Sequence, residues 1–169
     1  AQDFSSLLSA FRESSCLDQL VFLIVGDGRY RDTVVTIIES SQLTDKVFLL
    51  GRFDSSYMPY FYNIADILVL ALIDKPIFRL TLPGKIQSYM SSGKPIIAMA
   101  SGEAGSVIRE ANCGFSVDSG DVLGCSRLIE TCCSLPPEEL KALGGNGKAY
   151  AHRHFQYDKL VDELSSLIY

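Results

Sequence analysis

The sequence has little of what metal centres and nucleophilic active sites need. Only 2 of its 169 residues are histidine, and both lie near the C-terminal end, at His152 and His154. Residues two apart on a helix do not face each other, and no serine, histidine and aspartate pattern stands out. The 5 cysteines contain no C-x-x-C pair and no histidine at a matching spacing. A zinc site, a disulfide framework and hydrolase chemistry therefore have little support, and a reducing compartment fits the cysteine content.

Features of secreted, membrane-spanning and nucleic-acid-binding proteins are also lacking. No stretch approaches the ~18 apolar residues of a membrane-spanning helix. The opening residues, AQDFSSLLSAF, have no basic region and no long apolar run. The 15 basic and 20 acidic side chains leave a net charge of −5, which disfavours a surface that neutralises many phosphates. Because the chain begins with Ala1, we expect it to be processed or, in preference, cut from a longer protein.

What the sequence does contain is a regular alternation of short apolar runs and helical patterns. Hydrophobic residues make up 47% and charged residues 21%, which are ordinary globular values for a single domain. Apolar runs predict buried strands at 20–26, 46–51, 66–72, 94–100 and 115–117. Helical patterns occupy 29–43, 55–65, 83–93, 102–114, 121–133, 136–155 and 157–169. This order predicts an α/β fold with a parallel sheet and right-handed crossovers.

The predicted topology indicates where a ligand would bind. In parallel sheets ligands lie beyond the carboxyl ends of the strands. That rule selects the segments 26–29, 51–55, 72–85 and 100–105. The connection 73–82 is predicted to be a loop, and its length is unusual for a compact domain, which favours a functional role.

Glycine-containing turns follow two of these strands. Gly26-Asp27-Gly28 resembles a phosphate-binding turn, but no third glycine and no P-loop lysine follow. The same residues are equally usual in a plain strand-to-helix turn. Further along, Gly84 and Lys85 open a helix whose free N–H groups and positive dipole end would bind an anion. The alternative is an ordinary proline-started helix with a solvated lysine.

Single side chains at the other strand ends are candidates as well. Arg52 follows the second strand and would clamp a diphosphate bidentately, or else be a plain surface arginine. Glu103 would accept hydrogen bonds from sugar hydroxyls, or only stabilise the start of its helix. The aromatic residues of the segment 55–65 are expected to pack against the sheet; they are Tyr57, Tyr60, Phe61 and Tyr62.

Taken in order, these motifs resemble a known enzyme family. They are Gly26-Asp27-Gly28, Val47-Phe48-Leu49-Leu50-Gly51, Met58-Pro59 with Tyr62 and Ala65-Asp66, Pro83-Gly84-Lys85-Ile86-Gln87-Ser88-Tyr89-Met90 with Gly93-Lys94-Pro95-Ile96-Ile97-Ala98, Gly102-Glu103, and Ile108, Glu110, Ala111 and Gly114. The pattern is similar to the C-terminal half of a family 4 glycosyltransferase of GT-B fold. Within that family the pattern most resembles the bacterial branch that assembles O-antigen and capsular polysaccharides. The stretch 83–97 is the most specific part.

The resemblance implies a domain organisation. A GT-B enzyme has two Rossmann-like halves that face each other across a cleft. Residues 1–154 would be the nucleotide-sugar-binding half and 155–169 a helix that crosses back to the other half. The N-terminal half, which holds most of the acceptor site, would be absent. The start of the chain resembles the helix that follows the first strand of such a half, so that strand is expected to be missing.

The resemblance also implies an activity. The enzyme would transfer a sugar from a nucleotide-diphosphate sugar, often a UDP-sugar, to a glycan or lipid-linked acceptor, with retention and without a bound metal or cofactor. It would work in the cytoplasm, at the inner membrane face if its acceptor is lipid-linked, and the isolated half would be inactive. No catalytic residue is assigned. The donor diphosphate would meet Arg52, Gly84, Lys85 and Ile86, the base and ribose Leu50, Gly51 and Ser88, the sugar Gly102 and Glu103, and the weak phosphate turn is Gly26 and Gly28.

One departure from the family pattern keeps alternatives open. The usual pair of glutamates, eight residues apart, falls on Leu80 and Ser88, and neither is acidic. A serine binds ribose hydroxyls more weakly than a carboxylate does. The alternatives are a non-hydrolysing nucleotide-sugar epimerase, which needs more cleft carboxylates and histidines than this half offers, and a non-catalytic nucleotide-binding or scaffold module.

Overall fold

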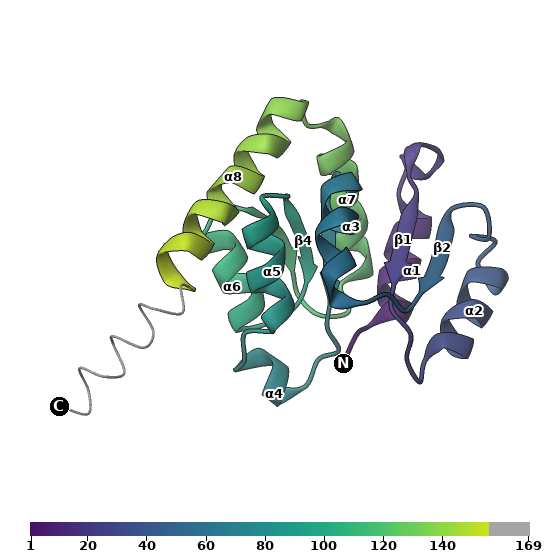
Figure 1. Ribbon diagram of the computed structural model, residues 1–169. Coiled ribbons are helices and arrows are strands. Elements are labelled where there is room, and N and C mark those ends of the chain that lie inside the picture. Colours follow the sequence, from purple (N-terminus) through teal and green to yellow (C-terminus); the bar gives the residue numbers. More distant parts are fainter. Residues whose placement is uncertain (156–169) are drawn as a thin grey trace.

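The computed structural model describes residues 1–155 as strands and helices in alternation (Figure 1). The strands are β1 (Phe22–Val25), β2 (Val47–Gly51), β3 (Leu68–Ala71), β4 (Ile96–Met99) and β5 (Gly114–Val117). The helices are α1 (Phe4–Glu13), α2 (Arg31–Ser40), α3 (Met58–Ile64), α4 (Pro76–Arg79), α5 (Gly84–Ser92), α6 (Glu103–Glu110), α7 (Val122–Ser134) and α8 (Pro137–His154), with the 3₁₀ turns η1 (Leu17–Gln19) and η2 (Ser55–Tyr57). The α/β class with parallel strands is confirmed.

Two sequence predictions need comment at this level. The segment 73–82 is not a plain loop, because it contains the one-turn helix α4, which Pro76 opens at a position where proline is favoured. The helix predicted for 157–169, and with it most of the proposed crossover segment 155–169, lies outside the described residues.

The strands form two hydrogen-bonded groups within residues 1–155. β1 pairs with β2, and β3, β4 and β5 form a second group in that order, with all pairs parallel. The sequence predicts a parallel sheet whose first strand is missing, and among the described residues no ladder joins β1 to β3. Residues at the chain start lie against the end of β3: the Asp3 N–H donates to the Ala71 carbonyl at 3.2 Å, and the Ile73 N–H donates to the Ala1 carbonyl at 3.0 Å.

The central strand β4 feeds two separate cores. Successive side chains of a strand point to opposite faces, and all of β4 is buried. Ile96 and Ala98 face a core with α5, α6 and α8, whereas Ile97 and Met99 face a core with α1 and α7. The result is a three-layer arrangement that fixes the helices following β3 and β4.

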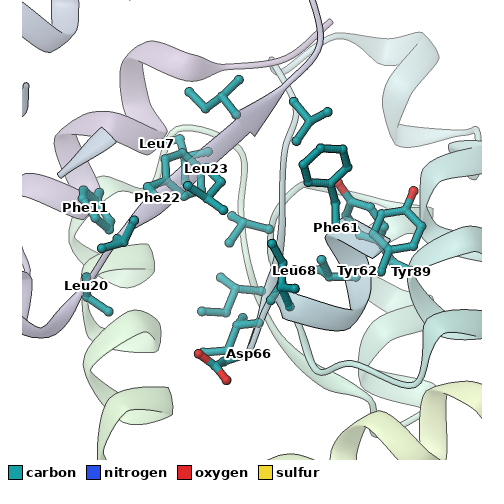
Figure 2. Close-up of a pocket in the computed structure, with 18 of the residues that line it drawn as sticks. Leu7, Phe11, Leu20, Phe22, Leu23, Phe61, Tyr62, Asp66, Leu68 and Tyr89 are labelled. Carbon is teal, nitrogen blue, oxygen red and sulfur yellow. The ribbon is translucent and has the colours of Figure 1, made fainter. Parts of the chain in front are cut away.

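The smaller sheet is covered on one face. Val47 of β2 packs with residues of α1 and α2, including Phe11 and Ile38. On the other face Leu23, Phe48 and Leu50 are exposed. Between β1 and β3 lies a cavity of about 530 Å³. Figure 2 shows Leu23 on one side of this cavity and Phe61, Tyr62 and Tyr89 on the other.

Candidate functional site

The first turn of α5 presents unpaired backbone donors at the carboxyl end of β3. Pro83 occupies the N-cap position, and its side chain makes no capping hydrogen bond. Within residues 1–155 the N–H groups of Gly84 and Lys85 have no backbone acceptor, whereas the Ile86 N–H donates to the Pro83 carbonyl at 2.9 Å. Orphan N–H groups at the positive end of a helix dipole form an anion-binding site.

Gly84 leaves this turn open to a ligand. A Cβ built on Gly84 would meet nothing within 4 Å, and the residue is exposed. The space beside the backbone is therefore free in the unliganded protein. A bound group can approach the Gly84 N–H closely because no side chain stands in the way.

Ile86 has a core role in the structure. Its side chain is fully buried with Met90 in the core that β4 shares with α5 and α8. Its N–H is already paired to Pro83. Its assignment as a diphosphate contact stays a prediction, and the N–H groups of Gly84 and Lys85 are the better placed donors of this turn.

The Lys85 side chain lines the cavity between β1 and β3, together with Met58, Tyr62 and Tyr89. Partial burial among these groups lowers the pKa of Lys85 from its ordinary value. The rings of Tyr62 and Tyr89 meet edge to face at 5.6 Å, and burial raises the pKa of Tyr89 to about 12. Lys85 as a whole is nonetheless exposed, so its ammonium is accessible to an anion in solution.

Ser88 lies one turn further along α5 and is exposed. Ser92 shares its face of the helix, but the Ser92 hydroxyl donates to the Tyr89 carbonyl at 2.6 Å. Lys85 and Ser88 are exposed on this side of α5 and therefore remain available to a ligand.

The connections that follow β3 and β4 meet at Gly102. This residue has φ +78°, and a Cβ there would collide with the backbone of Arg79. Arg79 itself holds Asp74 bidentately, at 2.7 and 2.6 Å, which lowers the pKa of the Asp74 carboxyl. Position 102 therefore requires glycine because the backbone packs closely against α4. Glu103 is exposed next to it, in the first turn of α6.

A second group of predicted residues gathers at the carboxyl ends of β1 and β2. The Gly26 N–H donates to the Gly51 carbonyl at 2.7 Å, which places the two strand ends side by side. Gly26, Asp27, Gly28 and Arg52 line an open hollow of about 400 Å³. The turn predicted to bind phosphate and the arginine predicted to clamp it therefore face the same space.

The predicted site residues thus fall into two groups on the two sheets. Among the described residues, no hydrogen bond or ion pair joins the group around Gly26 and Arg52 to the group around Gly84 and Glu103. Both groups occupy carboxyl ends of parallel strands, as the rule for such sheets predicts.

The prediction that the aromatic side chains of the segment 55–65 pack against the sheet is wrong for two of them. Tyr57 is 53% and Tyr60 71% exposed, so these two do not pack against the sheet, although Phe61 and Tyr62 are half-buried. Phe53 contacts the Phe61 ring at 4.8 Å and was not singled out. The error arises because an aromatic-rich segment of eleven residues, 55–65, offers more rings than one face of α3 can bury.

The sequence also missed the bidentate pair of Asp74 and Arg79, which closes α4. Opposite charges five residues apart in a presumed loop were the available signal. Within residues 1–155, no helix is long and apolar enough to cross a membrane.

Comparisons with known proteins place the chain in a family. A family model described as "Glycosyl transferases group 1" matches residues 2–150. N-acetyl-alpha-D-glucosaminyl L-malate synthase of Bacillus anthracis is 26% identical over 153 residues, which are 87% of this chain and 36% of that protein.

Two solved structures share the fold. HepE of Anabaena, crystallised with UDP and glucose, has a TM-score of 0.82 at 20% identity over 97% of this chain and 44% of its own. Sucrose-phosphate synthase of Thermosynechococcus elongatus has a TM-score of 0.81 at 20% identity, over 99% of this chain and 41% of its own. The chain therefore spans less than half the length of these relatives. The family match favours a glycosyltransferase over the epimerase alternative.

Because the family model matches most of its length, the chain belongs to the group 1 glycosyl transferases.

Proposed function

We propose that this chain binds the nucleotide-sugar donor in a glycosyltransferase that uses a UDP-sugar. The observation that carries the proposal is the first turn of α5, where two unpaired N–H groups, an open glycine and an exposed lysine converge at the carboxyl end of β3. The departing nucleoside diphosphate gains negative charge during transfer, and preorganised donors of this kind stabilise that charge. The bound UDP in HepE supports the choice of nucleotide.

Each predicted residue has a part in this proposal. The N–H groups of Gly84 and Lys85 and the Lys85 ammonium would bind the diphosphate. Leu50 and Gly51 would frame the base, Ser88 would bind the ribose, and Gly102 and Glu103 would border the transferred sugar. The hollow with Gly26, Gly28 and Arg52 would take part from the other sheet. No residue is proposed as the catalytic acid or base.

The setting of the enzyme is also part of the proposal. The stretch 83–97 favours a role in cell-surface polysaccharide synthesis, with retention and without a metal ion. The acceptor would bind to a separate N-terminal half, so this half alone would bind donor weakly and transfer nothing. The full enzyme would work in the cytoplasm, at the inner membrane face for a lipid-linked acceptor.

We further propose that the sheet is completed by one more strand between β1 and β3. The Phe22 N–H donates to Lys46 and the Leu68 N–H donates to Pro95, so in a parallel ladder the N–H groups of the following residues, Leu23 and Val69, point toward the cavity. Unpaired strand edges that border an apolar cavity favour a strand as its occupant. Amide exchange at Leu23 and Val69 should be fast in this chain and slow in a longer natural protein. Equally fast exchange in both would contradict the added strand.

The donor proposal is tested by an NMR amide titration of the chain with UDP, with UMP and GDP as comparators. We expect UDP to shift the Gly84 and Lys85 amides more than UMP does, because only UDP carries the second phosphate. NMR is suited because it detects millimolar binding, about −4 kcal/mol. Shifts confined to residues away from α5 and Arg52, or equal shifts with UMP, would contradict the proposal.

A further inference from the structure

The turn after α1 is docked along one face of α7. The Ser126 hydroxyl donates to the Ser14 hydroxyl at 3.4 Å, and the Ser15 N–H donates to the Glu130 carboxylate at 2.7 Å. Ser126, Glu130 and the residue three beyond it, Cys133, share a helix face. The turn therefore runs alongside α7 and brings its next residue, Cys16, to Cys133.

The two thiols stand in contact at the end of this face. The Sγ atoms of Cys16 and Cys133 are 2.9 Å apart, although the residues are 117 apart in sequence. That separation is longer than a disulfide bond, which is about 2.05 Å, but it places the two sulfurs in contact. Cys16 is 9% exposed and Cys133 is half-buried. Burial raises the pKa of the Cys133 thiol to about 12, so we expect the exchange to speed up as pH rises. Cys132 is adjacent, but it is buried in the core with Cys125.

We propose that Cys16 and Cys133 are a paired oxidation site that a low-molecular-weight disulfide, such as oxidised glutathione, converts to an intramolecular disulfide. The inference is independent of the donor site. It does not revive a disulfide framework, because all five cysteines are free thiols in the structure. It assigns one reversible bond to one preorganised pair.

The chemistry balances as a thiol–disulfide exchange. The thiolate of one cysteine attacks a glutathione sulfur, forms a mixed disulfide and releases one glutathione thiolate. The thiolate of the second cysteine attacks the protein sulfur of that mixed disulfide and releases the second glutathione. The protein loses two protons and two electrons, and one oxidised glutathione becomes two reduced ones. The second step is intramolecular because Cys133 and Cys16 already touch, which favours it over reaction with another glutathione.

The disulfide would tie the segment between α1 and β1 to α7. Cys16 immediately precedes η1, which leads into β1, whereas Cys133 lies in the last turn of α7 on the larger sheet. No ladder joins the two sheets within the described residues, so the new link would add a covalent bond to a junction held by packing and by the hydrogen bonds of Ser14 and Ser15 to α7. Closing so long a loop restricts the unfolded chain, and we expect the melting temperature to rise by roughly 5 to 15 °C.

The test uses the full chain and oxidised glutathione. After incubation the remaining thiols are blocked by alkylation, and the digested protein is mapped by mass spectrometry. We expect a cross-linked peptide pair that contains Cys16 and Cys133 and is lighter by two hydrogens, with Cys113 and Cys125 alkylated. In a parallel sample, a reducing agent added before alkylation should restore five free thiols.

Three variants make the result decisive. Cys132→Ser should leave the cross-link and the rise in melting temperature intact. Cys16→Ser and Cys133→Ala should each abolish both, and each should leave the remaining thiol as a mixed disulfide with glutathione. A cross-link from Cys16 to Cys132, glutathione adducts without a cross-link in the native chain, or no reaction until the protein is unfolded in urea would each overturn the proposal.

Discussion

At the scale of single residues, a substitution at Gly84 should change stability and UDP binding in opposite directions. A methyl group at this position meets nothing within 4 Å, and replacing glycine near a helix start removes backbone entropy from the unfolded chain. We expect Gly84→Ala to raise the free energy of unfolding by up to about 1 kcal/mol and to weaken UDP binding roughly tenfold, because the methyl group occupies the approach to the N–H groups.

Gly145 offers a matched control for that change. It lies in α8 and its Cβ position is also open. Gly145→Ala should stabilise the protein to a similar extent in urea denaturation and leave UDP binding, followed by NMR, unchanged. Equal affinities of the two variants for UDP would remove Gly84 from the binding site.

Lys85 should show the same trade between stability and binding as Gly84. Burial lowers its pKa, so the unfolded chain holds the proton more strongly than the folded protein does. The folded state is therefore penalised at neutral pH, and the penalty fades as pH rises through the lowered pKa toward the ordinary value of 10.5. Lys85→Met should unfold at a higher urea concentration than the parent at pH 7, and the difference should shrink at pH 10.

The same variant should lose UDP affinity at pH 7, since the cation that faces the diphosphate is gone. Lys148→Met, on α8, is the comparison for removal of a lysine outside the proposed site. If Lys85→Met binds UDP as well as this comparison variant does, the ammonium has no part in donor binding.

At the scale of elements, Gly102 fixes how the connections after β3 and β4 meet. A side chain there suffers a positive φ and a collision with the Arg79 backbone. Gly120 has a similar φ of +80° but open space around it, so it isolates the backbone strain. Gly120→Ala should lower the free energy of unfolding by about 1 kcal/mol, and Gly102→Ala by about 3 kcal/mol. Urea denaturation measures both, and equal losses would mean that α4 moves aside at no cost.

The elements also show what the sequence could predict. Continuous apolar runs identified the strands β1 to β5. The run KPIIAMA is continuous because β4 is buried on both faces, whereas β1 and β2 are apolar although one face of their sheet is exposed. Pro83 and Gly93 identified the ends of α5, because proline is favoured at the start of a helix and glycine just past its end. The sequence did not predict α4, because its four residues are too few to show a helical period.

The candidate site was predictable to the level of turns. Gly26 and Arg52 share a hollow, as strand-end reasoning implies. It was not predictable that the Ile86 N–H would be paired with the Pro83 carbonyl. Nor was it predictable which two strands would lack a shared ladder, because strand pairing depends on residues distant in sequence.

At the scale of the whole molecule, the two strand groups should differ in local stability. β4 is buried on both faces, whereas the sheet of β1 and β2 exposes Leu23, Phe48 and Leu50 on one face. Elements with little buried apolar surface open without global unfolding. Native-state amide exchange should therefore find Ile24 and Phe48, whose N–H groups lie in the ladder between β1 and β2, protected at least tenfold less than Ile97 and Ala98. Protection that is equal in both groups would mean that the sheets unfold as one unit.

The tight contact of α5 with α8 sets the position of the diphosphate turn from a distance. A Cβ on Gly144 would collide with the backbone of Gly93, the residue that caps α5 in the left-handed conformation. The nine residues of α5 make a rod of about 13 Å between this cap and the Gly84 end. Any group larger than hydrogen at Gly144 would push one end of that rod, and the stiffness of the helix would carry the displacement to the other. The contact between Gly144 and Gly93 therefore controls the position of the Gly84 end of α5, where the diphosphate is proposed to bind.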